Sequence, residues 1–175
     1  MGFLKYPQAF LHVLQTVIEI TSYRFILFTA GFEALDAAVR MIVAEASSCS
    51  SQTQLSEDCI SLFSSQLFCF TGQVTQLAFC CFPLCKISGT TAAALHAGIP
   101  QVVCPFMLDQ FYWAERMFWL GVAPEPLKRD QLLPDKNDDM SIREAANVLS
   151  RAINDALSPK VKACAIELAE RISLE

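Results

Sequence analysis

Two patterns of hydrophobic residues alternate along the chain. Apolar residues spaced three or four apart indicate an amphipathic helix, whereas a short unbroken apolar run indicates a buried strand. The first pattern predicts a helix over residues 7–20, opened by Pro7, and another over residues 35–46. The second pattern predicts a buried strand over residues 24–29, which Gly31 ends.

The next part of the chain allows two interpretations. Residues 47–58 are rich in Ser, Gln, Glu and Asp and predict a solvated polar loop. Residues 59–85 carry no charge, which raises the alternative of a membrane span. Their Ser, Thr and Gln side chains, together with Gly72 and Pro83, would find no water inside a bilayer, so we favour buried strands. Two strands are predicted in this stretch, over residues 67–70 and 77–87.

The second half continues the alternation. A helix is predicted over residues 90–96, followed by Gly98, a residue type that tolerates the left-handed backbone at a helix end. The apolar run of residues 100–105 lies between two prolines and predicts a strand. A helix over residues 109–120 begins at Asp109, whose carboxylate could accept backbone N–H groups there.

Two more helices are predicted towards the C-terminus. One covers residues 141–157, where Ser141 and Glu144 have the spacing of a capping box, and the other covers residues 160–172. Strands alternating with helices are typical of parallel α/β layering, in which ligands bind beside the carboxyl ends of the strands.

Composition narrows the function to small-molecule chemistry. The chain has 175 residues, 53% of them hydrophobic, which suits one α/β domain over residues 1–175. The formal net charge is −5 and the 13 Lys and Arg residues are scattered, so we expect no nucleic-acid partner. The high apolar content predicts buried strands, a lipid-facing surface, or a face that another domain covers.

Neither the N-terminus nor the cysteines indicate secretion. The first ten residues lack a signal-peptide pattern, and Tyr6 stands where a myristoylation motif has Ser or Thr. The 8 cysteines follow no regular spacing, so we interpret them as small buried hydrophobes in a reducing compartment. Cys80, Cys81 and Cys85 cluster without a second set of zinc ligands, so no metal site is predicted.

The first chemical motif is a candidate phosphate cradle. Ser88, Gly89, Thr90 and Thr91 connect an apolar run to the helix predicted over residues 90–96. The first turn of a helix offers unpaired N–H groups and partial positive charge, while glycine lets the backbone approach an anion. The same residues also fit a plain helix cap, which is the commoner structure for such a motif taken alone.

The second motif is an acid beside an amide at the start of a helix. Asp109 can accept hydrogen bonds from sugar hydroxyls, and Gln110 can both donate and accept. A plain N-cap is the alternative interpretation of this pair. Trp113, Phe118 and Trp119 fit core or interface positions better than a platform for a sugar.

The two motifs occur together in a recognisable block. Residues 88–124, SGTTAAALHAGIPQVVCPFMLDQFYWAERMFWLGVAP, closely resemble the donor-binding segment of UDP-dependent glycosyltransferases. The nearest group is the plant and fungal sterol 3-beta-glucosyltransferases. The resemblance extends upstream through residues 3–70 and downstream through the last helices, covering most of the chain.

This resemblance implies a fold, a reaction and a set of site residues. The fold would be a Rossmann-like parallel α/β sheet with flanking helices, the C-terminal lobe of a two-lobed glycosyltransferase of the GT-B type. The reaction would transfer glucose from UDP-glucose to the 3-hydroxyl of a sterol or another lipid acceptor, with inversion and without a metal or cofactor. The protein would be cytoplasmic and peripheral at membranes. Ser88, Gly89, Thr90 and Thr91 would contact the diphosphate, and Asp109 and Gln110 the sugar hydroxyls.

The sequence departs from the family in three places. Residues 84–87 read Leu-Cys-Lys-Ile where the family has His-His-Gly-Gly, and residues 73–83 lack the Trp or Tyr that stacks on uracil. The chain also aligns from just after the first strand of the lobe, so that strand and the N-terminal acceptor lobe are expected to be missing.

These departures leave the catalytic status of the chain open. Neither His12 nor His96 matches the family's catalytic base, so no catalytic residue is assigned. One hypothesis is a sterol-type glucosyltransferase. The other is a truncated donor-binding fragment or interaction module without transfer activity.

Overall fold

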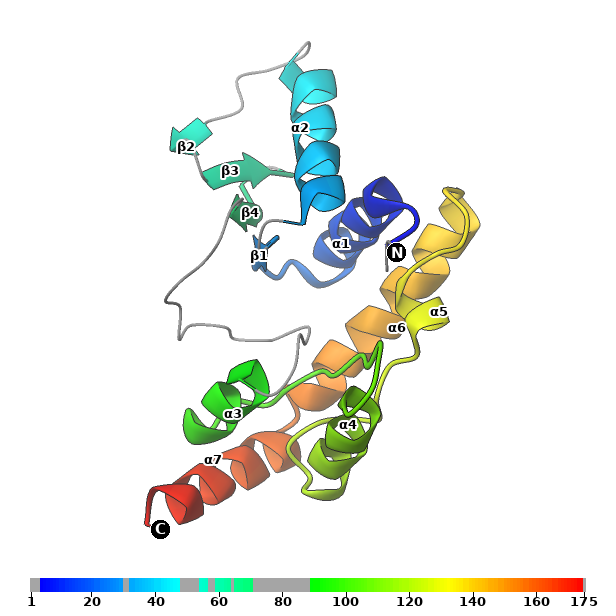
Figure 1. Cartoon of the computed structure of the whole chain (residues 1–175). Coiled ribbons are helices and arrows are strands. Elements are labelled where there is room, and N and C mark those ends of the chain that lie inside the picture. Colours follow the sequence, from blue (N-terminus) through cyan, green and yellow to red (C-terminus); the bar gives the residue numbers. More distant parts are fainter. Residues whose placement is uncertain are drawn as a thin grey trace. The chain divides into compact units, whose positions relative to one another are not determined.

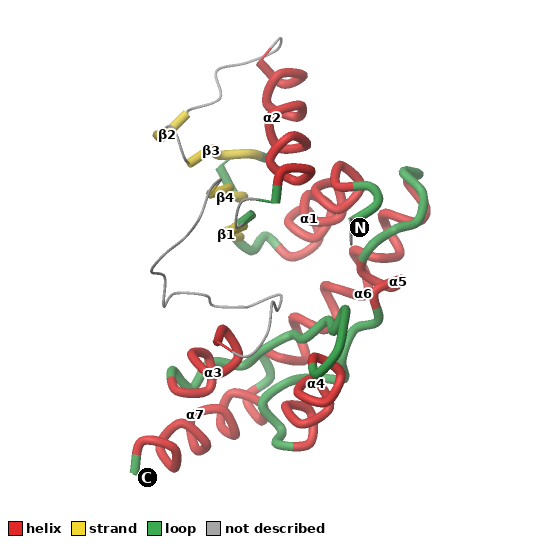
Figure 2. Tube along the Cα trace, viewed as in Figure 1, coloured by secondary structure: helices red, strands yellow, loops and turns green. Residues whose placement is uncertain are grey.

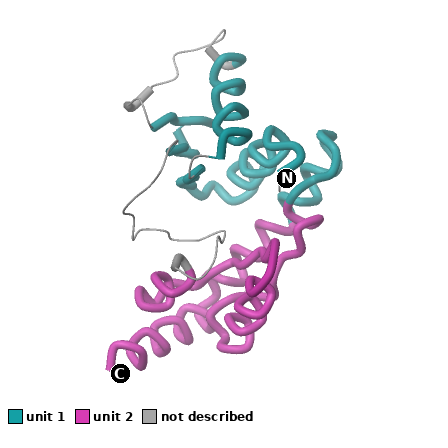
Figure 3. Tube along the Cα trace, in the orientation of Figure 1, with its two compact units in different colours: residues 1–77, 133–147 teal, residues 78–132, 148–175 magenta. Residues whose placement is uncertain are grey.

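The computed structural model describes residues 4–29, 32–47, 54–56, 59–63, 65–70 and 89–174. The chain divides into two compact units (Figure 3). The first contains residues 1–77 and 133–147, and the second contains residues 78–132 and 148–175.

The first unit contains a mixed four-stranded sheet in the order β1-β4-β3-β2. Strand β1 (Phe25–Phe28) pairs with β4 (Leu67–Phe70) in parallel, and the Phe28 and Phe70 rings stack with centroids 5.3 Å apart. Strand β3 (Cys59–Leu62) is antiparallel to β4, and β2 (Gln54–Ser56) is antiparallel to β3. The parallel pairing expected from the sequence is confirmed for β1 and β4, the predicted strands that the structure describes. It is wrong for β2 and β3, which make the sheet mixed because β4 runs back along β3.

Helices α1 (Pro7–Thr21) and α2 (Glu33–Ser47) pack against each other in this unit (Figure 1). Both confirm the helices predicted from apolar spacing, and Leu11, Val13 and Val17 of α1 are fully buried. Strand β1 confirms the apolar run, but Ile26 is 56% exposed, so the predicted full burial is wrong. The predicted polar loop of residues 47–58 contains β2, and the strand predicted over residues 77–87 lies outside the described residues.

The described part of the second unit contains helices and extended segments but no strand. It contains α3 (Gly89–His96), α4 (Gln110–Trp119), the short α5 (Arg129–Leu132) and α7 (Pro159–Ser173). Helix α6 (Asp139–Ala156) begins in the first unit and ends in the second. The core of the second unit is formed by Val103, Ala114, Met117, Val122, Ala123 and Ala165.

The segment predicted as a strand over residues 100–105 is extended but is not a strand within the described part of the chain (Figure 2). It is buried from Gln101 through Cys104. Two separate backbone bonds attach it, from Gln101 N to the Val122 carbonyl (3.0 Å) and from Leu127 N to the Val103 carbonyl (2.9 Å). The apolar run therefore predicted correctly that this segment is buried. It could not predict whether the segment pairs with a neighbouring strand, because a hydrogen-bonded ladder also needs that second strand.

Helix ends explain two further differences from the sequence predictions. Helix α6 begins at Asp139 because Asp138 accepts from Ser141 N (2.9 Å) and from Ser141 Oγ (3.1 Å), so the predicted cap at Ser141 is wrong. Gly98 follows α3 with a φ of +64°, as expected, and the Ile99 N–H bonds back to the Ala94 carbonyl (2.9 Å). No helix among the described residues is long and apolar enough to cross a membrane.

Candidate functional site

The candidate phosphate cradle lies at the start of α3. Ser88 lies outside the described residues, whereas the backbone of Gly89 and Thr90 forms the first turn of the helix. An α-helix leaves its first N–H groups without intrahelical partners, so this turn has the donors that an anion needs. The contact of Gly89 and Thr90 with a phosphate stays a prediction, and what the structure gives is the helix start at these residues.

Thr91 faces the protein interior. Its side chain is only 5% exposed, and its carbonyl oxygen accepts a hydrogen bond from Gln101 Nε2 at 3.3 Å. Gln101 is fully buried, so this contact ties the first turn of α3 to the extended segment that leads to α4. The predicted contact of Thr91 with a diphosphate stays a prediction, and the burial of this side chain leaves its hydroxyl little access to a ligand.

Asp109 and Gln110 occupy different environments at the start of α4. Asp109 is exposed and has helical dihedral angles, and its carboxylate makes no capping hydrogen bond. The predicted N-cap role of this carboxylate is therefore wrong, which leaves the side chain accessible to a ligand. Gln110 is only 6% exposed, and its Oε1 accepts from the backbone N–H of Phe106 and of Met107, the latter at 3.1 Å.

Gln110 consequently holds the loop that places Asp109. Met107 and Leu108 lie in this loop, and Leu108 has a φ of +51°. Two backbone donors converge on one buried amide oxygen, so the loop conformation depends on that side chain. The predicted contact of Gln110 with sugar hydroxyls stays a prediction, and its Oε1 atom is already engaged by the loop.

Aromatic side chains surround the outer part of α4. Trp113, Phe118 and Trp119 are 41%, 45% and 75% exposed, so they are not core residues and the interface interpretation remains. The Tyr112 and Trp113 rings meet edge to face with centroids 5.4 Å apart. Only Gln110, Ala114 and Met117 of this helix are buried.

Gln101 belongs to neither of the two sequence motifs. Its place inside an otherwise apolar run could have indicated a structural role, because a buried amide needs hydrogen-bond partners. The Gln101 Oε1 atom is buried and has no partner among the described residues. Its position next to the first turn of α3 makes it a supporting residue of the candidate site.

The described cysteines and acidic residues do not form a metal site. No group of three or more His, Cys, Asp and Glu side chains in the described ranges is placed to hold a metal ion. Cys59, Cys69, Cys104 and Cys164 are free thiols, and the predicted cluster of Cys80, Cys81 and Cys85 lies outside the described residues. Burial raises the pKa of the Cys104 thiol to about 12, so this group stays protonated.

Known proteins resemble part of this chain. A sterol 3-beta-glucosyltransferase of Arabidopsis thaliana is 34% identical over 100 residues, which cover 54% of this chain and 14% of the relative. A second sterol 3-beta-glucosyltransferase of the same plant is 37% identical over 100 residues, with the same coverage. A terpene cyclase-glycosyl transferase fusion protein of Humicola fuscoatra is 32% identical over 88 residues, which cover 50% of this chain and 6% of the relative.

These matches confirm the predicted resemblance to the sterol glucosyltransferase group, over about half of the chain rather than most of it. The chain spans about one seventh or less of the length of these relatives. No model of a known protein family matches the chain, and no solved structure matches it.

Proposed function

We propose that this chain provides the donor-binding part of a glycosyltransferase that acts on sterols. The donor is UDP-glucose, whose diphosphate binds at the first turn of α3 and whose glucose binds at Asp109. In this proposal the fold corresponds to the C-terminal lobe of a GT-B glycosyltransferase. The sugar nucleotide is a co-substrate, and no metal or cofactor takes part.

The exposed carboxylate of Asp109 is the observation that carries the proposal. It begins α4 without capping that helix, and the Gln110 amide fixes the loop before it. The same unit contains the first turn of α3, and Gln101 ties that turn to the segment leading into Asp109. A phosphate-binding turn and a free carboxylate on one connected framework suit a ligand with an anionic end and a hydroxylated end.

The proposed reaction inverts the anomeric carbon of glucose. The sterol 3-hydroxyl attacks that carbon, its proton passes to a base, and UDP leaves with the electrons of the broken bond. The N–H groups at the start of α3 stabilise the charge that develops on the leaving diphosphate. The acceptor lobe and its base are partners of this site in the proposal, and the acceptor's membrane origin favours a peripheral cytoplasmic location.

Calorimetric titration of the purified chain with UDP-glucose and with UDP tests the two contacts separately. Thr90→Val, at the cradle, should weaken both ligands, whereas Asp109→Ala should weaken only UDP-glucose, each by about fivefold to tenfold. Asp130→Ala is the matched control, because Asp130 is an exposed acid in the same unit. Wild-type affinity in both test variants would refute the assigned site.

A donor-binding module without transfer activity is the second candidate. The replacement of His-His-Gly-Gly by residues 84–87 favours it, because glycine allows a tight turn that Leu-Cys-Lys-Ile does not. Transfer of radiolabelled glucose to sterol in vesicles separates the candidates. Turnover that Asp109→Ala abolishes supports the enzyme, and UDP-glucose binding without turnover supports the module.

A further inference from the structure

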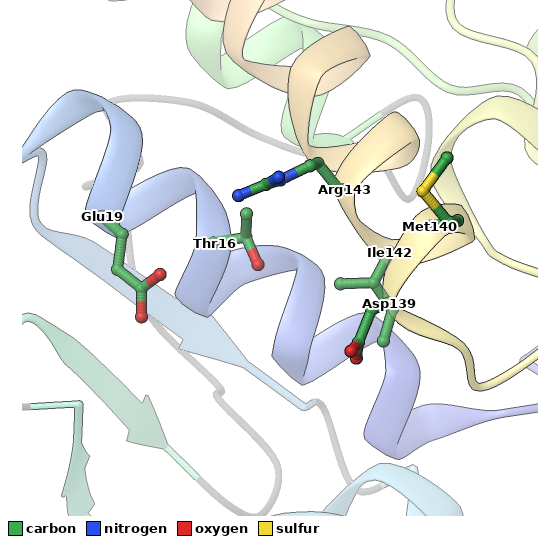
Figure 4. A pocket seen from close by; sticks show the side chains of 6 residues that line it. All are labelled: Thr16, Glu19, Asp139, Met140, Ile142 and Arg143. Atoms are coloured by element: carbon green, nitrogen blue, oxygen red, sulfur yellow. The ribbon is translucent and has the colours of Figure 1, made fainter.

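A groove in the first unit lies between α1 and the beginning of α6, apart from the residues assigned to the nucleotide sugar. It has a volume of about 320 Å³ and is lined by Thr16, Glu19, Asp139, Met140, Ile142 and Arg143 (Figure 4). An overlapping hollow of about 290 Å³ adds three polar residues, His12, Gln15 and Asn137.

The α1 wall of the groove is a polar stripe held by hydrogen bonds along the helix. Gln15 Nε2 donates to Glu19 Oε1 (3.1 Å), and His12 Nδ1 lies 3.4 Å from Gln15 Oε1. Thr16 Oγ1 donates to the His12 carbonyl at 2.9 Å. The side chains of this wall are thus partly ordered before any ligand arrives, which lowers the entropy that binding costs.

The α6 wall presents charges of both signs. Asp138 fixes the start of the helix through Ser141, so Asp139 lies in an ordered first turn and Arg143 in the turn after it. Ile142 lies between them with 8% exposure and gives the groove an apolar floor.

The two polar walls face each other without bonding to each other. Arg143 extends towards α1 (Figure 4), yet among the described residues it forms no ion pair with Glu19 or Asp139. Likewise, no hydrogen bond in the described part of the chain joins the α1 side chains of the groove to those of α6. The polar groups that line the groove are therefore not bonded across it, and a molecule between the walls can bond to both sides.

We propose that this groove binds a small neutral polyhydroxylated molecule of sugar size. A hydroxyl both donates and accepts, so it can satisfy carboxylates, amides and a guanidinium within one site. Arg143 disfavours a cationic ligand, and Glu19 with Asp139 disfavours an anionic one. The buried Ile142 side chain supplies an apolar contact for the C–H face of a sugar ring. This site does not depend on the donor site proposed above.

A ¹⁵N NMR titration of the full chain with methyl glucoside tests the proposal. We expect saturable shifts of backbone amides over residues 12–19 and 137–143. Arg143→Gln and Glu19→Gln should each weaken this binding by about fivefold, the effect of losing one hydrogen bond. Arg40→Gln and Glu33→Gln are matched controls, because both residues are exposed in helix α2 of the same unit and do not line the groove.

Separate outcomes distinguish this groove from the donor site. Asp109→Ala should leave the shifts over residues 12–19 unchanged, and unaltered thermal unfolding shows that each variant is folded. The proposal is overturned if methyl glucoside causes no shifts in the groove, or if the test variants bind it like the controls. Saturation of the groove by arginine or by inorganic phosphate, but not by methyl glucoside, also overturns it.

Discussion

At the scale of single residues, neighbouring side chains in one motif perform different tasks. Asp109 and Gln110 form one polar pair in the sequence, yet Gln110 is buried under the loop while Asp109 is exposed. The difference arises because Gln110 lies on the same face of α4 as Ala114 and Met117, which pack into the core. The side chain on the buried face of α4 is the one that bonds to the preceding loop, and the sequence pair alone does not show which residue that is.

Replacing Gln110 should destabilise the second unit. Gln110→Leu leaves the N–H groups of Phe106 and Met107 without their acceptor, at a cost of about 1–3 kcal/mol. Gln131→Leu removes a similar bond from Lys128 N (2.9 Å) in an exposed position, where water can replace it. Urea unfolding of both variants measures the difference, and equal free energies of unfolding would contradict the role of Gln110.

The cap at Asp138 should give the start of α6 a pH dependence. Hydrogen bonds from the Ser141 backbone and hydroxyl lower the pKa of Asp138 below its ordinary value of 3.8. A lowered pKa in the folded state stabilises the protein above the unfolded-state pKa, and this contribution is lost as the pH falls through the folded-state value. The wild-type protein should therefore lose thermal stability as the pH falls from 5 into the acidic range, and Asp138→Asn should lose less. Calorimetric scans of both proteins over this pH range measure the difference.

At the scale of elements, α3 is fixed against α7 through a glycine. A Cβ added at Gly98 would lie 3.3 Å from Ile166 Cα and 3.4 Å from Ala169 Cβ, and the residue has a φ of +64°. A side chain is therefore disfavoured both by the backbone conformation and by the closeness of α7. The position of the candidate cradle at the other end of α3 depends on this contact.

Gly98→Ala should lower the free energy of unfolding by about 1–3 kcal/mol. Gly121→Ala is a matched comparison, since Gly121 has a φ of +74° but its nearest atom is the Cys164 Sγ at 3.4 Å. Gly121→Ala should lower the free energy of unfolding by less than Gly98→Ala, because the Cys164 sulfur can move aside whereas the backbone of α7 cannot. Denaturant unfolding measures both, and a larger loss in Gly121→Ala would contradict this packing argument.

At the scale of the whole molecule, each unit buries a thiol. Cys69 lies in β4 of the first unit and Cys104 in the extended segment of the second, and burial raises the pKa of each to about 12. Thiols react as thiolates, so both should be inert in the folded protein at neutral pH.

Maleimide labelling followed by peptide mass analysis tests this expectation. Cys164 is only partly buried and should react in the native protein, whereas Cys69 and Cys104 should react only after unfolding. Labelling of Cys69 and Cys104 in urea then reports the unfolding of each unit separately. Native labelling of Cys104 as fast as that of Cys164 would contradict the buried position of the extended segment.

The sequence by itself determined most helices and the resemblance. The spacing of apolar residues predicted α1, α2, α4 and α7 within a few residues, because amphipathic helices encode their buried face locally. The block of residues 88–124 indicated the sterol glucosyltransferase group, to which relatives confirm similarity over about half of the chain.

Only the tertiary structure decided the features that depend on distant neighbours. The antiparallel pairing of β3 and β4 and the cap at Asp138 each require partners that local patterns do not specify. The same holds for residues 100–105, which form no ladder with any strand that the structure describes. Tertiary packing also explains why Gln110 is buried while Asp109 is exposed, and why polar residues of α1 and α6 line the same groove. The sequence therefore defines which chemical groups this protein has, and packing determines which of those side chains are exposed to a ligand.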